Sequence, residues 1–185
     1  GEILKDTQYD SIYHEHLFYY SLSNLNKLLK EFNFNLYHVE KSPISGGSLI
    51  IFFSKKKYQM SSQLHKFLIK EKTLKLNNLN TWKKFSKKVY LHRDKIKKIL
   101  KNKKEVLAYG ASARSSTFLN FCKISNKLIK GICDKNILKH NKYTPGSKIQ
   151  IINPSKINWK KEIYVVILSW NFYNEILGYL KKKRI

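Results

Sequence analysis

The chain has 185 residues, of which 42% are hydrophobic and 14% aromatic, enough to bury one hydrophobic core and a small second one. A formal net charge of +25 ordinarily suggests nucleic acid or another anionic partner, but the lysines are spread along the whole chain, so we expect no dedicated nucleic-acid partner. No charged-then-apolar leader opens the chain and no apolar run approaches the ~18 residues that cross a bilayer, so we expect a soluble, cytoplasmic protein without a membrane partner.

A cluster of ionisable residues, IYHEH at 12–16, lies just before the first predicted helix. If this segment is extended, His14 and His16 point to the same side, and a His-x-His pair of this kind can bind zinc. Such a site needs about three or four protein ligands, and the sequence offers no convincing further set, so we expect no metal. Acid–base catalysis and a purely structural role stay open, and spacing alone does not decide which histidine is a base.

A helix and an antiparallel hairpin are predicted next. Ser21 or Ser23 is suited to cap a helix with an apolar face at three- and four-residue steps, and Asn33 is suited to end it in the left-handed conformation. The runs NLYHVEK and GGSLIIFFS read as two strands joined by a turn that contains Gly46 and Gly47. A helix and a hairpin do not enclose a core alone, so this half should pack on something else.

Residues 58–104 carry a helical pattern with lysines on the opposite face. The apolar residues that recur at three- and four-residue steps are Trp82, Phe85, Val89, Ile96 and Ile99. A lysine stripe of this kind is typical of a solvated face, so we interpret the segment as a helical connection.

The second half alternates strands and helices. The apolar runs EVLAYG, LIKGICD, IQII and IYVVILSW predict strands, while ASARSSTFLNFCK and NFYNEILGYLKKK predict helices. Continuous apolar strands between helices are typical of a parallel sheet covered on both faces. Cys122 and Cys133 have apolar neighbours and no metal-ligand spacing, which indicates reduced core residues. The predicted fold class is α/β, a Rossmann-like parallel sheet flanked by helices.

Ligands of such sheets bind outside the carboxyl ends of the strands. The loop YGASARSST, residues 109–117, leads into a helix N-terminus that favours phosphate, although its single glycine, Gly110, fits a simple tight turn equally well. Asp134 follows the next strand, where its carboxylate is suited either to accept ribose hydroxyls or to stabilise a turn. Asn171 follows the last strand and is suited to cap the final helix. The candidate substrate-binding residues are Tyr109, Gly110, Ser112, Arg114, Ser115, Ser116, Thr117, Asp134 and Asn171.

Six ordered blocks of this chain resemble the C-terminal part of the S-adenosylmethionine-dependent sugar-nucleotide C-methyltransferases. The blocks are YDSIYHEHLFYYSLSNLNKLL, GGSLIIFF, YGASARSSTFLNF, CDKN, YTPGSKIQI and VVILSWNFYNEI. The resemblance covers nearly the whole chain, and the Tyr-His-Glu-His motif is its most specific part. It implies transfer of a methyl group to C3 of a nucleoside-diphosphate 4-keto-deoxysugar.

The resemblance also implies roles for individual residues. His16 resembles the base that removes the C3 proton, with Tyr13 and Glu15 as supporting residues. The strand–helix loop and the neighbouring strand ends would hold the nucleotide-sugar. Arg114-Ser115 stands where the family usually has lysine-glycine, which keeps the positive charge but changes the approach of a phosphate to the loop backbone.

A domain organisation follows from the same resemblance. Residues 1–57 resemble the C-terminal end of a class I methyltransferase domain, its last helix and hairpin, with Ser45 where the family often has histidine. Residues 58–104 form the helical connection, and residues 105–185 a Rossmann-like substrate-binding domain. S-adenosylmethionine would be bound mainly by an upstream methyltransferase domain, the second expected partner besides the nucleotide-sugar. We therefore expect this polypeptide alone to bind no cofactor and to be inactive.

Two other functions stay open at this point. A non-catalytic module that binds nucleotides or nucleotide-sugars would keep the second-half loop but tolerate loss of His16. A basic nucleic-acid-binding protein would use the lysines, and its affinity would fall steeply with added salt.

Overall fold

The computed structural model describes residues 1–43 and 47–183 and divides into two compact units. Unit 1 comprises residues 1–8 and 16–88, and unit 2 comprises residues 9–15 together with the chain from Val89 onward. Ser45 and Gly46, which carried predictions, lie outside the described residues. The predicted domain boundaries concern the organisation of a longer protein and stay a prediction.

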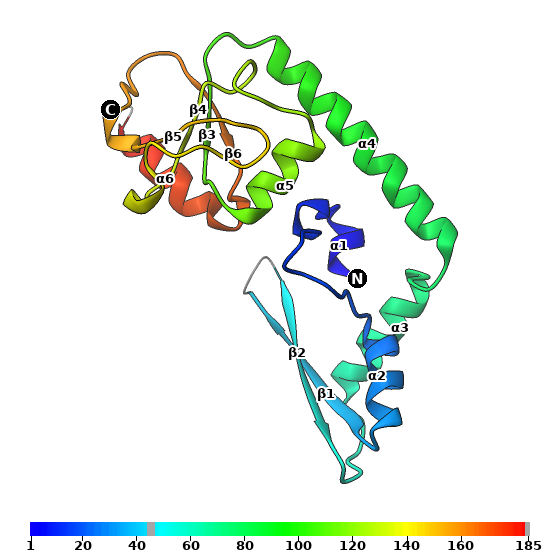
Figure 1. Ribbon diagram of the computed structural model, residues 1–185. Helices are drawn as coiled ribbons and strands as arrows, with labels where there is room; N and C mark the ends of the chain where they lie inside the picture. The colour runs from blue at the N-terminus through cyan, green and yellow to red at the C-terminus, as the bar shows by residue number, and fades with distance from the viewer. Residues whose placement is uncertain (44–46, 184–185) are drawn as a thin grey trace. The chain divides into compact units, whose positions relative to one another are not determined.

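Unit 1 combines helices with a two-stranded antiparallel sheet, which confirms the predicted hairpin. Helices α2 and α3 both pack on β1 (Figure 1). The buried core consists of Leu22, Leu36, Val39 and Leu64. The elements are α1 (Glu2–Lys5), α2 (Leu22–Glu31), β1 (Asn35–Ser42), β2 (Ser48–Ser54), α3 (Ser62–Thr73) and the first part of α4 (Leu79–Lys101).

Both predicted ends of α2 are present. The Ser21 hydroxyl accepts the backbone N–H of Asn24 at 3.1 Å, so Ser21 is the N-cap. Asn33, just after the helix, has φ 61°, the left-handed conformation that stops a helix. The segment that follows the histidine cluster is therefore a helix with a fixed start and a fixed end.

A carboxylate distant in sequence adds a second cap to α2. Glu71 is buried on α3, and its two carboxylate oxygens accept the backbone N–H groups of Leu22 at 2.8 Å and Ser23 at 3.0 Å. These donors have no partner inside the helix, and a negative charge complements the positive end of the helix dipole. Glu71 thus ties α3 to the start of α2.

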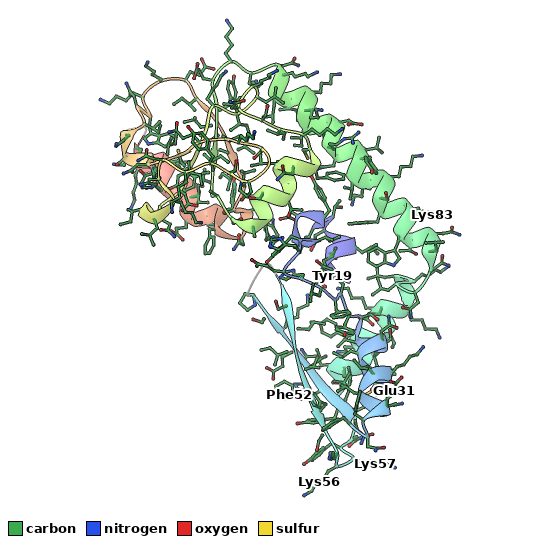
Figure 2. The ribbon with its side chains drawn as sticks, in the orientation of Figure 1. Tyr19, Glu31, Phe52, Lys56, Lys57 and Lys83 are labelled. Atoms are coloured by element: carbon green, nitrogen blue, oxygen red, sulfur yellow. The ribbon has the colours of Figure 1, made fainter. Side chains whose placement is uncertain are left out.

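Replacing Glu71 with alanine is expected to lower the free energy of opening of α2 by about 2 kcal/mol, because one buried and one partly buried N–H donor lose a charged acceptor. Amide hydrogen exchange of Leu22 and Ser23 measures this locally. Glu31→Ala is the matched control, since this glutamate is exposed on the same helix (Figure 2), and it should change the value by less than about 0.5 kcal/mol. Unchanged exchange in Glu71→Ala would show that water replaces the cap.

Unit 2 is a four-stranded parallel sheet in the order β5-β4-β3-β6, which confirms the predicted α/β fold. Leu107 and Tyr109 of β3 pack with Ile176 of α6, while Val106 and Ala108 alternate to the other face; all four strand residues are buried. Figure 1 shows α5 and α6 beside the sheet. The elements are β3 (Val106–Tyr109), α5 (Ala113–Phe121), β4 (Gly131–Cys133), β5 (Ile151–Ile152), β6 (Tyr164–Ile167) and α6 (Tyr173–Lys183).

The two cysteines are buried free thiols, as predicted for core residues. Burial raises the pKa of both thiols, that of Cys133 to about 12. Neither is a thiolate at neutral pH, so neither is suited to act as a nucleophile.

A short segment early in the chain, residues 9–15, belongs to unit 2. It begins with the 3-10 turn η1 (Tyr9–Ser11), which packs on α5. The buried Tyr9 ring lies against Phe118 and Phe121, and its hydroxyl is 3.0 Å from Nδ1 of His92. The segment that carries Tyr13 and His14 is therefore held on the parallel-sheet unit.

Within the described part of the chain, no helix is both long and apolar enough to cross a membrane.

Candidate functional site

Three loops meet at the carboxyl end of the unit 2 sheet, as the strand order predicts. Gly110, after β3, has φ 97°, and a Cβ atom there would overlap the side chain of Ser169, after β6. The next backbone N–H, of Ala111, donates to Oδ2 of Asp134, after β4, at 2.8 Å. Close approach and positive φ together require glycine at position 110.

The loop after β3 is shaped by its own serines. Ser112 is the N-cap of α5, and its Oγ accepts the backbone N–H of Ser115 at 3.2 Å. The buried Ser115 hydroxyl donates to the Gly110 carbonyl at 2.7 Å. Ser115 therefore holds the loop and lies beneath its surface.

Asp134 braces this loop. Its Oδ2 accepts from Ala111 and, at 3.4 Å, from the Lys139 ammonium, while Oδ1 accepts the backbone N–H of Asn136 at 2.8 Å. Asp134 thus acts as a turn residue, which is one of the two roles that the sequence left open for it. The ribose-binding role stays a prediction, since a ribose hydroxyl would share these oxygens.

A pocket of about 550 Å³ lies beside this loop. Its volume is within the range of ~300–1,000 Å³ that is typical of small-molecule sites. The lining residues, all from unit 2, are Tyr13, His14, Ala111, Ser112, Ala113, Ser116, Thr117, Asn120, Lys139, Thr144, Pro145 and Ile151.

The pocket brings together Tyr13 from the motif segment and the hydroxyl-bearing residues Ser112, Ser116 and Thr117. It does not include every predicted site residue. Those outside its lining are Glu15, His16, Tyr109, Gly110, Arg114, Ser115, Asp134 and Asn171. Several of these shape or brace the loop instead of facing the cavity.

Tyr109 is buried at the end of β3 with its ring against Tyr179. Burial raises the pKa of its phenol to about 12, so the group is protonated at neutral pH. Asn171 is the middle residue of the 3-10 turn η5 (Trp170–Phe172), and Ser169 precedes that turn. The interpretation of Asn171 as a cap of the final helix is therefore wrong.

His16 belongs to unit 1, where its ring lies edge-on to Tyr19 with 6.2 Å between the centroids. It follows His14 by two positions in the chain. In the described residues, no group of three His, Cys, Asp or Glu side chains is placed to hold a metal ion.

Lys139 is a pocket residue that sequence reasoning missed. Its ammonium donates to the Ala111 carbonyl at 2.7 Å, which fixes a positive charge at the pocket. Among 37 lysines and arginines, nothing in the composition distinguishes this one. Asn120, Thr144 and Pro145 are further pocket residues that sequence reasoning missed. Asn120 lies in the block YGASARSSTFLNF and the other two lie in YTPGSKIQI, so the resemblance offered a signal for all three.

A parallel α/β sheet with a pocket beside the loops at the carboxyl ends of its strands defines a Rossmann-like class of domain, in which ligands bind at that edge. The model of one family, described as C-methyltransferase C-terminal domain, matches residues 43–184, and the chain belongs to this family. A curated relative, C-methyltransferase NovU of Streptomyces niveus, is 28% identical over 182 residues. That alignment covers 95% of this chain but 43% of the relative, so the chain spans less than half of the relative's length.

Proposed function

We propose that this chain is the nucleotide-sugar-binding part of an enzyme that transfers a methyl group from S-adenosylmethionine to C3 of a nucleoside-diphosphate 4-keto-deoxysugar. The observation that carries the proposal is that Tyr13 and His14 line the same pocket as the strand–helix loop. Residues of the motif segment and residues suited to bind a nucleotide thus share one cavity.

The chemistry suits the residue types of the motif. Carbon C3 becomes a nucleophile when a base removes its proton, which the adjacent ketone acidifies, and a donor stabilises the enolate oxygen. We assign the base to His16 and the donor to Tyr13, with Glu15 orienting or charge-balancing the histidine.

The anionic end of the substrate finds two positive features in the pocket. Lys139 provides an ammonium with three donors, and two of them are accounted for by Ala111 and Asp134. The N-terminus of α5 adds the positive end of a helix dipole. Ser116 and Thr117 line the same wall, and their hydroxyls donate to the carbonyls of Ser112 and Ala113.

The cofactor is assigned to another part of a longer protein. S-adenosylmethionine supplies the methyl group, and we assign none of its contacts to the residues of this chain. The transfer itself is accordingly proposed for the longer protein, with an upstream methyltransferase domain as partner.

Calorimetric titration of this polypeptide with uridine diphosphate and thymidine diphosphate tests the nucleotide site. Lys139→Met is expected to weaken binding at least about tenfold, because a charged phosphate contact is lost. Lys142→Met removes an equal charge from an exposed position outside the pocket and should change the affinity less than about twofold.

Equal losses in the two lysine variants, together with a steep salt dependence, would instead point to non-specific binding of polyanions. Absence of binding to either diphosphate would contradict the proposed site. A non-catalytic nucleotide-sugar module gives the same titrations as the enzyme, so catalysis needs the separate test of His16 described below.

A further inference from the structure

We propose that Arg114 is a positioning residue, which holds the segment of Tyr13 and His14 at the pocket through Asp10. This differs from the sequence-based expectation that its guanidinium meets a phosphate directly. The use of the pocket for a nucleotide-sugar rests on the proposed function, whereas the positioning contact itself stands on the geometry of unit 2.

The contact is a partly buried ion pair. The Arg114 Nε donates to Oδ2 of Asp10 at 2.9 Å, and the two side chains are 15% and 14% exposed. The indole Nε1 of Trp170 donates to the same carboxylate oxygen at 3.0 Å, and the guanidinium lies 4.5 Å from the centre of the Trp170 ring. Loss of one partner leaves the other charge largely shielded from water and without its counter-charge.

Helix α5 presents different faces to the segment and to the pocket. Arg114, Phe118 and Phe121 contact Tyr9 or Asp10, and their spacing of four and three residues places them on one helix face. The pocket is lined by a second set with helical spacing, which is Ala113, Ser116, Thr117 and Asn120. Because Arg114 lies on the helix face that contacts η1, it is placed to hold η1, while the residues of the other face of α5 line the pocket.

The chain between this contact and the pocket is short. Tyr13 follows Asp10 by three positions, so their Cα atoms lie at most ~11 Å apart. Tyr9 is fixed by burial against α5 and α4. With Tyr9 and Asp10 both anchored on unit 2, the position of Tyr13 and His14 depends on this anchor.

The two roles of Arg114 predict opposite effects of Asp10→Asn. If Arg114 binds phosphate, removal of the competing carboxylate leaves anion binding unchanged or improves it. If Arg114 positions the segment, Asp10→Asn and Arg114→Met both weaken the anchor, because each removes one charge of the pair, and their double variant is scarcely worse than either one. Arg114→Lys keeps the charge but not the planar fork over Trp170, so it should rescue only part of the loss.

The first measurement needs no ligand. Backbone ¹⁵N relaxation of Tyr13 and His14 should give order parameters of roughly 0.85 in the unaltered chain and below about 0.6 in Asp10→Asn and Arg114→Met. The Trp170 indole N–H resonance should shift in both variants, because its acceptor changes or moves. Rigid, unshifted segments in both variants would overturn the proposal.

The second measurement is uridine diphosphate affinity, for which both single variants and their combination should show a similar loss of about fivefold. Arg93→Met is the matched control, since Arg93 also pairs with an aspartate and lies over an aromatic ring, but on α4. Loss in Arg114→Met alone, with normal Asp10→Asn, would restore the direct phosphate role. If the unaltered chain binds no diphosphate, the proposed function fails while the relaxation experiment still decides the positioning role.

Discussion

Gly110→Ala is expected to lower the free energy of unfolding of unit 2 by about 4 kcal/mol. The backbone at this position has φ 97°, which an L residue adopts only with strain. The added Cβ would also overlap the Ser169 side chain, which lies against the loop. Urea unfolding followed by the fluorescence of Trp159 and Trp170, the tryptophans of unit 2, measures the change.

Two further variants separate the causes of that loss. Gly178→Ala adds the same methyl group in α6 where nothing lies within 4 Å, so it should leave unit 2 as stable or slightly more stable. Combining Gly110→Ala with Ser169→Gly removes the overlap but not the strained φ, and we expect recovery of about 2 kcal/mol. Wild-type stability in Gly110→Ala alone would mean that the loop does not need the left-handed conformation.

The expected loss is large because Gly110 lies where the three loops of the site converge. Its carbonyl accepts from Ser115, and the following amide donates to Asp134. A displaced Gly110 therefore moves the loops after β3, β4 and β6 together. Stability of this unit and the shape of the pocket depend on the same few atoms.

Local signals account for the features that the sequence predicted correctly. A cap such as Ser21 or a left-handed stop such as Asn33 is decided by residues three or four positions away. The strands of unit 2 are short apolar runs, and their order along the chain indicates a parallel sheet. The position of polar residues after those strands then follows from topology.

Contacts between distant residues account for what the sequence did not predict. The pair of Arg114 and Asp10 spans 104 positions, and the cap of Leu22 by Glu71 spans 49. No sequence periodicity connects residues so far apart. A single charged residue in the sequence therefore fits the role of a ligand contact and that of a solvated side chain equally well. The sequence pattern accordingly places Arg114 among the substrate-binding residues and assigns no role to Glu71.

The segment around the histidine motif shows the same limit. In the sequence it lies just before a helix of unit 1, yet residues 9–15 pack in unit 2. The decisive interactions are the burial of Tyr9 on α5 and the Asp10 ion pair, neither of which is a local pattern. Tertiary packing thus divides the motif, with His14 in unit 2 and His16 in unit 1.

His16→Ala is expected to reduce turnover by about 10²- to 10⁴-fold in the longer protein that carries the methyltransferase part, because the base that forms the enolate is lost. Binding of the nucleotide end should change little, since His16 is not among the residues that line the pocket. The value of kcat should therefore fall much more than KM rises. His65→Ala, at an exposed histidine of α3, is the matched control and should retain full activity.

Exchange of the substrate C3 proton in deuterated water isolates the step assigned to His16. This exchange needs the base and the bound sugar but no methyl transfer, so it is followed without S-adenosylmethionine. His16→Ala should abolish it, while Lys139→Met should slow it mainly through weaker binding and recover at high substrate concentration. A non-catalytic module would show no exchange even in the unaltered protein.

His14→Ala distinguishes the two histidines that spacing alone left equivalent. His14 lines the pocket, so its loss should weaken substrate binding while exchange at saturating substrate persists. His16→Ala should instead abolish the exchange even at saturating substrate, because the base itself is lost. The reverse pattern would transfer the base to His14, the histidine that shares unit 2 with the loop and Lys139.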